Sequence, residues 1–363
     1  MTNAHPQQVV FVLPDLAGGG AQSVMLNLAG ALDTADFQCQ ILAAGRDRTL
    51  DNRVPDSISV ETGGFAQLRR GLPWLVKRIR SIRPDVVVSV MGYLNLSLLA
   101  LRPFFPKETR LIVREANALE ATLRELPGLL RIVDPYRRFY PRADAVVAPT
   151  SIIANQILRA APAAANHVHV VRNPVDTKTL LARAAKPKRT EGEGLRLVAA
   201  GRLTHQKGFD RLLDMASQLP SSSRIDVFGE GSDRTKLQST ARALGVDELV
   251  TFRGFTDDLP NWIAGADAFL LPSRWEGLPN VVLESLALGT PAIISDEAAA
   301  DDLVNNAESV SVTSVTVGKA FVEAIEQLAP LVSKPTLPRR SLLPACYTAE
   351  KVASVWSELL SPQ

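Results

Sequence analysis

Short apolar runs alternate with helical segments along this chain, in two series separated by a polar stretch. In the first series, strand-like runs lie at residues 9–13, 37–43, 86–90, 110–113, 145–148 and 168–171, with helices such as 21–32 and 152–160 between them. In the second series, strand-like runs lie at residues 195–200, 224–228, 249–252, 268–271 and 291–294, and helices at 209–218, 233–244 and 281–288. This alternation is typical of βαβ units with a parallel sheet. We therefore expect an α/β protein with two doubly wound, Rossmann-like domains.

The polar stretch separates the two domains. Residues 178–194 lose their periodicity and are rich in Lys, Arg, Pro, Glu and Gly, which is typical of a linker. We place the N-terminal domain at residues 1–177, the linker at 178–194, the C-terminal domain at 195–345 and a last helical segment at 346–363. Each sheet should bind ligands at the carboxyl ends of its strands, and the facing edges of the domains should form the active cleft.

The composition disfavours a disordered or fibrous protein. With 363 residues, 46% of them hydrophobic and 21% charged, the chain is ordinary for a globular enzyme of two domains. Its two cysteines, Cys39 and Cys346, lie far apart without a histidine cluster, which favours a reducing compartment over a zinc site. We predict no signal peptide, and the longest apolar run, 86–101, is better explained by a buried strand and helix than by a membrane span. We expect a cytoplasmic protein.

Basic residues concentrate in the N-terminal half of the chain. A short amphipathic helix predicted at residues 73–83 places Lys77, Arg80 and Arg83 on a different face from its apolar residues. Basic amphipathic helices bind anionic lipid or phosphate groups. The alternative is a helix packed on the core with a solvated face. Nothing in the sequence indicates a nucleic-acid partner.

A run of three glycines, Gly18 to Gly20, follows the first strand and opens a helix. Such a turn lets a ligand approach the backbone at a helix N-terminus. Its spacing is not the G-x-G-x-x-G of a dinucleotide site, and no acidic residue ends the second strand. Both absences disfavour a dinucleotide-dependent oxidoreductase.

The loop after the first strand of the second series contains two cations, Arg202 and Lys207. A planar guanidinium and a mobile ammonium together suit a diphosphate, and the alternative is a surface loop with ordinary charges. The chain has no Asp-x-Asp sequence and no histidine with metal-ligand spacing, so we expect neither a metal nor another cofactor. The charge that assists a leaving group would then come from these cations and a helix end.

Two carboxylates, Glu276 and Glu284, lie eight residues apart. Glu276 falls in a Gly/Pro turn, and Glu284 falls two turns into a helix predicted at residues 280–288. The turn directs backbone N–H groups toward the space before the helix, and such a helix end attracts anions. Two acidic side chains would repel a bound phosphate, unless they face neutral hydroxyl groups of the same ligand. The pattern therefore favours a sugar nucleotide.

In this order along the chain, the motifs resemble those of the retaining glycosyltransferases of family 4, which have the GT-B fold of two facing Rossmann-like domains. The resemblance covers most of the chain, and its most specific part is the Glu-x7-Glu element. Shorter matching pieces are Asn173-Pro174-Val175-Asp176, Phe228-Gly229-Glu230-Gly231 and Phe252-Arg253-Gly254-Phe255. The family fold also implies that the C-terminal helix packs back on the N-terminal domain.

The resemblance implies roles for individual residues. Arg202, Lys207 and Glu276 would be catalytic, with the two cations on the diphosphate and Glu276 facing the transferred sugar, while Glu284 would accept hydrogen bonds from the ribose. The remaining donor-binding residues would be Gly19, Gly20, Arg253, Gly254, Phe255, Gly277, Leu278, Pro279, Asn280 and Val281. The implied reaction retains the anomeric configuration by front-face attack, with a UDP-sugar as donor.

One loop departs from the family. Many members place a histidine after the fourth N-domain strand, where this chain has Arg114-Glu115-Ala116-Asn117. Similar loops occur in members that extend polyprenyl-diphosphate-linked glycans. We therefore expect Arg114 and Asn117 to contact a glycan acceptor, and Lys77 and Arg80 to contact its lipid or an anionic membrane, as in a peripheral membrane protein. The alternatives are a soluble small-molecule acceptor and a catalytically inactive nucleotide-sugar-binding protein.

Overall fold

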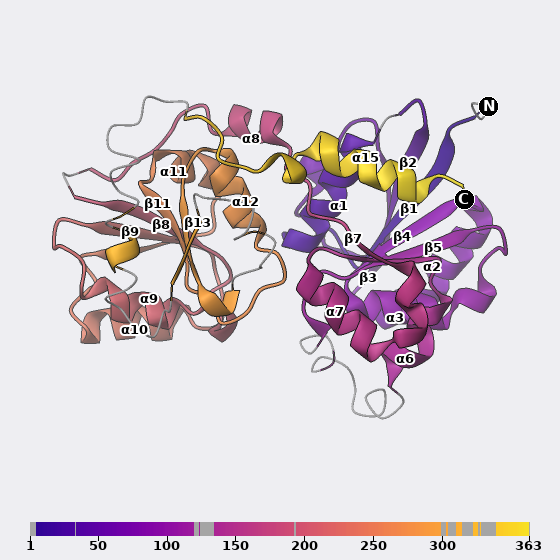
Figure 1. The fold of residues 1–363 in the computed structure, drawn as a ribbon, viewed down its shortest axis with the longest axis horizontal. Coiled ribbons are helices and arrows are strands. Elements are labelled where there is room, and N and C mark those ends of the chain that lie inside the picture. The colour runs from indigo at the N-terminus through magenta and orange to yellow at the C-terminus, as the bar shows by residue number, and fades with distance from the viewer. Residues whose placement is uncertain are drawn as a thin grey trace. The chain divides into compact units, whose positions relative to one another are not determined.

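The chain folds into two compact units. The structure is a computed structural model, and it describes residues 5–32, 34–119, 123, 134–191, 194–298, 303, 310–313, 322–325, 327 and 339–362. Unit 1 comprises Met1–Pro174 and Cys346–Gln363, and unit 2 comprises Val175–Ala345. Each unit has a parallel sheet with helices on its faces (Figure 1). The prediction of two doubly wound α/β domains is confirmed.

Unit 1 is built on a seven-stranded sheet in the order β3-β2-β1-β4-β5-β6-β7. Its strands are β1 (Gln7–Leu13), β2 (Phe37–Gly45), β3 (Ser59–Phe65), β4 (Val86–Val90), β5 (Arg110–Arg114), β6 (Ala145–Ala148) and β7 (Val168–Val170). The central strands are buried on both faces, which explains their unbroken apolar runs. Strand β3 lies at an edge with half-exposed side chains, so it lacks the apolar run by which the other strands were predicted.

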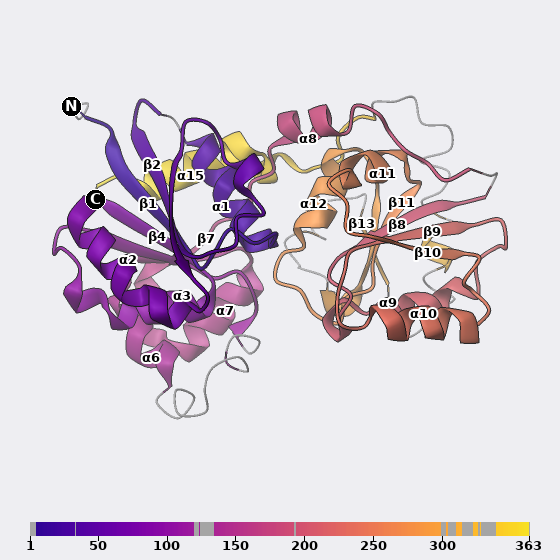
Figure 2. The ribbon, with the colours of Figure 1, turned by 180° about the vertical axis from the view of Figure 1, so that it is seen from behind.

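Helices cover both faces of this sheet. They are α1 (Gly20–Ala31), α2 (Leu68–Ile82), α3 (Gly92–Ala100), α6 (Pro135–Phe139), α7 (Ser151–Ala160) and α15 (Ala349–Leu360). Helices α1 and α15 share one hydrophobic cluster, and α2, α3 and α7 contribute to a second cluster. Figures 1 and 2 show the two groups of helices on opposite faces of the sheet.

The last helix completes the core of unit 1. Trp356 of α15 is 1% exposed and packs in the cluster that contains β1 and α1. The guanidinium of Arg110, at the start of β5, donates hydrogen bonds of 2.8–2.9 Å to the carbonyl oxygens of Leu359, Leu360 and Ser361. The expected return of the C-terminal helix to the N-terminal domain is confirmed.

Unit 2 has a six-stranded sheet in the order β10-β9-β8-β11-β12-β13. Its strands are β8 (Arg196–Ala200), β9 (Arg224–Phe228), β10 (Val250–Gly254), β11 (Ala268–Leu271), β12 (Ala292–Ser295) and β13 (Val310–Thr313). Its helices are α8 (Thr177–Arg183), α9 (Phe209–Ala216), α10 (Arg234–Ala243), α11 (Leu259–Gly265) and α12 (Asn280–Ala287). Helices α8 and α11 had no predicted counterpart.

The segment predicted as a linker is fastened to unit 2. Its first part forms α8, and the backbone N–H of Lys188 donates to the carbonyl oxygen of Asn261 at 2.8 Å. Arg189 then makes two hydrogen bonds of 2.8 Å to the carboxylate of Asp267. Part of the predicted linker therefore contacts unit 2. The domain limits drawn from the sequence stay predictions.

Candidate active site

In each sheet the strand order reverses beside the first strand of the unit. In unit 2, β9 lies on one side of β8 and β11 lies on the other. Ligands of doubly wound folds bind outside the carboxyl ends of the strands at such a switch point. The loop after β8 carries Arg202 and Lys207, and the loop after β11 carries Glu276. Two sequence motifs separated by about seventy residues thus converge on the expected position.

Lys207 and Glu276 form an ion pair. Lys207 Nζ lies 2.5 Å from Glu276 Oε1, and the two side chains are 17% and 8% exposed. The hydroxyl of Ser273 donates a second hydrogen bond of 2.7 Å to the same oxygen. Separating a largely buried ion pair leaves an uncompensated charge away from water, which costs much more than separating a surface pair. The two groups are therefore fixed relative to one another.

Glycines allow the two loops to approach. Gly208, directly after Lys207, has a φ of +64°, and a Cβ there would lie 2.0 Å from the carbonyl oxygen of Pro272. The stem of Lys207 runs over Gly201, where a Cβ would lie 3.3 Å from Lys207 Cδ. Any side chain at Gly208 would separate the loops, and one at Gly201 would press on the lysine.

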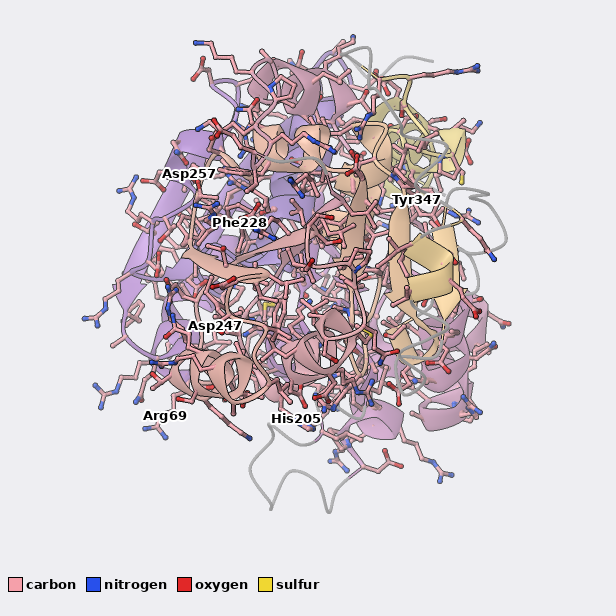
Figure 3. All side chains as sticks on the ribbon, turned by 90° about the vertical axis from the view of Figure 1, so that its left-hand side faces the viewer. Arg69, His205, Phe228, Asp247, Asp257 and Tyr347 are labelled. Atoms are coloured by element: carbon pink, nitrogen blue, oxygen red, sulfur yellow. The ribbon has the colours of Figure 1, made fainter. Side chains whose placement is uncertain are left out.

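Arg202, unlike Lys207, has no side-chain partner among the described residues. Its side chain is exposed, and within the described ranges no residue forms a hydrogen bond or ion pair with its guanidinium. His205, labelled in Figure 3, is also exposed in the 3-10 turn His205–Lys207 that leads to Gly208. The loop therefore offers one guanidinium that is available to an anionic ligand.

Helix α12 begins at Asn280, as predicted, and ends at Ala287. Its N-cap residue, Pro279, provides no side-chain hydrogen bond, so first-turn N–H groups are not capped from that position. Leu278 is buried beneath the turn, and Glu284 is half-buried in the second turn of the helix. The predicted donor contacts of Gly277 to Val281 and of Glu284 stay predictions.

The predicted base-binding group is only partly exposed to a ligand. Arg253 donates a hydrogen bond of 2.7 Å from Nε to Asp226, and its guanidinium lies 5.1 Å from the ring centre of Trp262. These contacts hold it against unit 2, so its side chain serves the fold. Gly254 has a φ of +78°, and Phe255 is 63% exposed. Arg253 is exposed nevertheless, as is Phe255, whereas Gly254 is buried, and the expected base contacts of all three stay predictions.

In unit 1, the glycine turn is braced from within. Gln22 of α1 donates a hydrogen bond of 3.0 Å to Asp15, and the N–H of Ala17 donates to the same carboxylate oxygen at 3.1 Å. The Gln22 amide packs so closely on Gly19 that a Cβ there would lie 2.3 Å from Gln22 Oε1. Helix α1 then starts at Gly20 without a side-chain cap. The turn has no room for a Cβ at Gly19. The expected ligand contacts of Gly19 and Gly20 stay predictions.

In the loop from Arg114 to Asn117, one of the two predicted acceptor-binding residues is buried and the other is exposed. Arg114 is the last residue of β5 and is 2% exposed, with its guanidinium hydrogen-bonded to Asn173. It therefore does not face an acceptor from the surface. The reason is that the strand extends one residue beyond the predicted end, which brings Arg114 inside the unit. Asn117 is exposed in the following loop.

Glu115 is also buried, and it belongs to a polar network. Its Oε1 accepts hydrogen bonds from Asn95 of α3, at 3.2 Å, and from the hydroxyl of Tyr140. Its Oε2 has no hydrogen-bond partner in the described part of the chain. Burial raises the pKa of Glu115 to about 7, despite the opposing effects of Asn95 and Arg114. Burial also disfavours the charged form of Arg114, which lowers the pKa of this residue to about 10.

The basic helix is longer than predicted. Helix α2 begins at Leu68 and contains Pro73, which was expected at its start. Lys77 and Arg80 are exposed, as is Arg69, which Figure 3 labels. By contrast, Arg78 is held by Glu61 at 2.6 Å. The helix therefore presents a basic exposed face, and its contact with lipid stays a prediction.

Sequence reasoning missed the side chains that brace these groups. Ser273 bonds to Glu276, and Arg274 makes two hydrogen bonds, of 2.8 and 2.5 Å, to Asp210. No sequence pattern pairs Arg274 with Asp210. The network of Glu115 did leave a signal, because Asn95 interrupts the apolar run that forms β4 and α3.

Within the ranges that the structure describes, no three His, Cys, Asp or Glu side chains gather as metal ligands would. Metal independence nevertheless stays a prediction. In the same ranges, no helix combines the length and the hydrophobicity that crossing a membrane requires.

Comparison with known proteins identifies both halves of the chain. Residues 18–179 match the family described as Glycosyltransferase Family 4, and residues 194–330 match that described as Glycosyl transferases group 1. The lipopolysaccharide core biosynthesis glycosyltransferase LpsE of Rhizobium meliloti is 25% identical over 85% of this chain and 85% of its own length. The lipopolysaccharide 1,6-galactosyltransferase of Escherichia coli is 24% identical over 80% of this chain and 79% of its own.

Solved structures share the fold. Sucrose-phosphate synthase of Thermosynechococcus elongatus aligns with a TM-score of 0.78 and 17% identity, over 97% of this chain and 98% of that one. Anabaena HepE in complex with UDP aligns with a TM-score of 0.69 and 16% identity, over 98% of this chain and 99% of that one. With both domains present in sequence and two Rossmann-like units in space, the chain belongs to the family 4 glycosyltransferases of GT-B fold.

Proposed function

We propose that this glycosyltransferase transfers a sugar from a UDP-sugar to a lipid-linked glycan with retention of configuration and without a metal ion. The product would belong to a cell-surface polysaccharide or glycoconjugate. The observation that carries the proposal is the ion pair of Lys207 and Glu276 at the switch point of unit 2, with the uncommitted Arg202 in the same loop.

The cations would stabilise the departing diphosphate. An ammonium has three donors, so Lys207 can keep its bond to Glu276 while it donates to a phosphate oxygen. Arg202 can bind two phosphate oxygens with its planar fork, and the N-terminus of α12 adds a partial positive charge. Donors fixed in advance of the reaction cost no reorganisation when charge develops. This arrangement supports leaving-group departure without a metal.

Glu276 would bind a sugar hydroxyl and would not act as a nucleophile. One of its carboxylate oxygens already accepts bonds from Lys207 and Ser273, which lowers its reactivity. In the proposed front-face reaction, the bond between the anomeric carbon and the phosphate oxygen breaks. The acceptor oxygen bonds to that carbon on the same face, and its proton passes to the departing phosphate oxygen. Glu284 would meanwhile accept hydrogen bonds from the ribose.

The comparisons support the choice of donor and acceptor class. HepE has been solved with UDP and with UDP-glucose, which supports a UDP-sugar here. The relatives in Rhizobium meliloti and Escherichia coli are named for lipopolysaccharide synthesis, and one in Erwinia amylovora is named for amylovoran biosynthesis. These names support a glycan acceptor over a small soluble one.

Nucleotide binding and donor turnover test the donor part of the proposal. Thermal-shift titration with UDP, GDP and NAD should raise the melting temperature most with UDP. Hydrolysis of UDP-galactose or UDP-glucose should proceed in excess EDTA. Stabilisation by NAD alone, or activity that EDTA abolishes, would contradict the donor assignment or the metal independence, respectively.

Lipid binding tests the acceptor part. We propose that the exposed face of α2 holds the enzyme on the inner surface of the cytoplasmic membrane, since Lys77 and Arg80 are exposed there. Reversal of both charges to Glu should weaken binding to vesicles of anionic phospholipid and reduce transfer to a polyprenyl-diphosphate glycan. The matched control reverses Lys236 and Arg242, a Lys and an Arg exposed on α10 of unit 2. Equal effects of the two double variants would refute a specific role for α2.

A further inference from the structure

Two loops of unit 2 contact each other at successive positions. We call residues 201–208 the lysine loop and residues 272–279 the glutamate loop. The backbone N–H of Arg274 donates to the carbonyl oxygen of Gln206 at 2.8 Å. The Gln206 side chain donates in turn to the carbonyl oxygen of Trp275 at 3.1 Å. The next contact along the two loops is the ion pair of Lys207 with Glu276.

Arg274 fastens this arrangement to a helix. Its Nη1 donates to the carbonyl oxygen of His205 at 2.8 Å, which ties the two loops together again. Its guanidinium also binds both carboxylate oxygens of Asp210, at 2.8 and 2.5 Å. Asp210 is the second residue of α9 and therefore belongs to the first turn of that helix. A two-point bond from a planar guanidinium fixes orientation as well as distance.

We propose that Arg274 is a positioning residue that sets the separation of Lys207 and Glu276. It would act through both loops and would not touch the donor. Because Lys207 and Glu276 derive their roles from the proposed function, this inference rests on that function. The contacts of Arg274 on which the inference is built all lie within unit 2 and do not depend on the proposed function.

The expected signature is coupling between Arg274 and Lys207. Residues that act through one network show non-additive effects, whereas independent sites add. Arg274→Ala should lower the turnover of UDP-galactose hydrolysis by about tenfold in the wild-type background. In a Lys207→Ala background, where the ammonium to be positioned is gone, the same change should lower turnover by less than about twofold.

Three further variants define the interaction. Asp210→Asn should reproduce most of the loss seen with Arg274→Ala, because an amide has one oxygen and cannot accept the two-point bond. Arg274→Lys should restore little, since an ammonium cannot form the two-point bond. Arg242→Ala is the control, because the Arg242 guanidinium donates to the carbonyl oxygen of Gln238 in its own helix, α10. It should leave turnover unchanged.

Calorimetric titration with UDP separates the possible failures. If wild type binds no UDP and hydrolyses no UDP-sugar, the proposed function is wrong, and Arg274 has no reaction to position. If wild type is active and Arg274→Ala costs the same factor with and without Lys207, only the positioning proposal is overturned. In that case Arg274 stabilises the fold and does not act through Lys207.

Discussion

Replacement of Glu115 by Gln should change how the stability of unit 1 depends on pH. Glu115 is buried, and its neutral form fits the site, because Oε1 accepts two hydrogen bonds while Oε2 has no partner among the described residues. Gln keeps the shape and the accepting oxygen and carries no charge at any pH. The substitution therefore isolates the cost of ionising this carboxyl group.

The sign follows from the two pKa values. The pKa of Glu115 rises from an ordinary 4.5 to about 7 on folding. Between these values the unfolded chain has released the proton that the folded chain still holds, so the free energy of unfolding falls as pH rises. The pKa change of 2.5 corresponds to about 3 kcal/mol, at 1.36 kcal/mol per unit. Glu115 thus contributes stability that is fully present below pH 4.5 and lost as the pH passes 7.

Urea denaturation at several pH values measures this effect. Glu115→Gln should match wild type near pH 4.5 and exceed it at pH 8 by about 3 kcal/mol. Glu108→Gln, which removes an exposed carboxylate of the same unit, is the control and should follow wild type throughout. Parallel stability curves for Glu115→Gln and wild type between pH 4.5 and 8 would refute the reasoning, because the carboxyl group would then ionise at the same pH in both states.

Four further predictions concern the site and the core. Arg202→Ala and Lys207→Ala should each remove about 2–4 kcal/mol of transition-state stabilisation, seen as a loss of kcat/KM in donor hydrolysis. Glu284→Gln should raise the KM for the donor with little change in kcat, which initial-rate kinetics will show. Gly208→Ala should lower both turnover and melting temperature, because the positive φ and the Pro272 carbonyl exclude a Cβ. Trp356→Ala should cost about 3–5 kcal/mol of stability in urea denaturation, as expected for a fully buried aromatic side chain.

The sequence predicted the parallel sheets well because their buried strands are unbroken apolar runs. β4, β6, β9 and β11 have the predicted bounds. Strand β3 escaped prediction because an edge strand with half-exposed side chains needs no such run. Helix α2 was predicted too short because Pro73 favours a helix start, whereas it lies inside the helix with an exposed side chain.

For the candidate site, motifs predicted loops but could not predict what side chains do within them. Lys207 and Glu276 were predicted on the two loops that the structure brings together, but not as partners of each other. Arg253 was expected at a base and is exposed, but it also bonds to Asp226, while Arg114 was expected at an acceptor and is buried. Both outcomes depend on residues distant in sequence, which a local pattern does not contain.

The return of α15 to unit 1 has a consequence for the order of events during synthesis. Residues of β1 and α1 share a hydrophobic cluster with Trp356 and Leu360, which the ribosome adds more than three hundred residues later. Unit 2, by contrast, is formed from one continuous segment, Val175–Ala345. Unit 2 can therefore finish folding before unit 1, although unit 1 is synthesised first. Until α15 emerges, the nascent chain exposes the apolar surface on β1 and α1 that this helix covers, which makes that surface a natural binding site for chaperones.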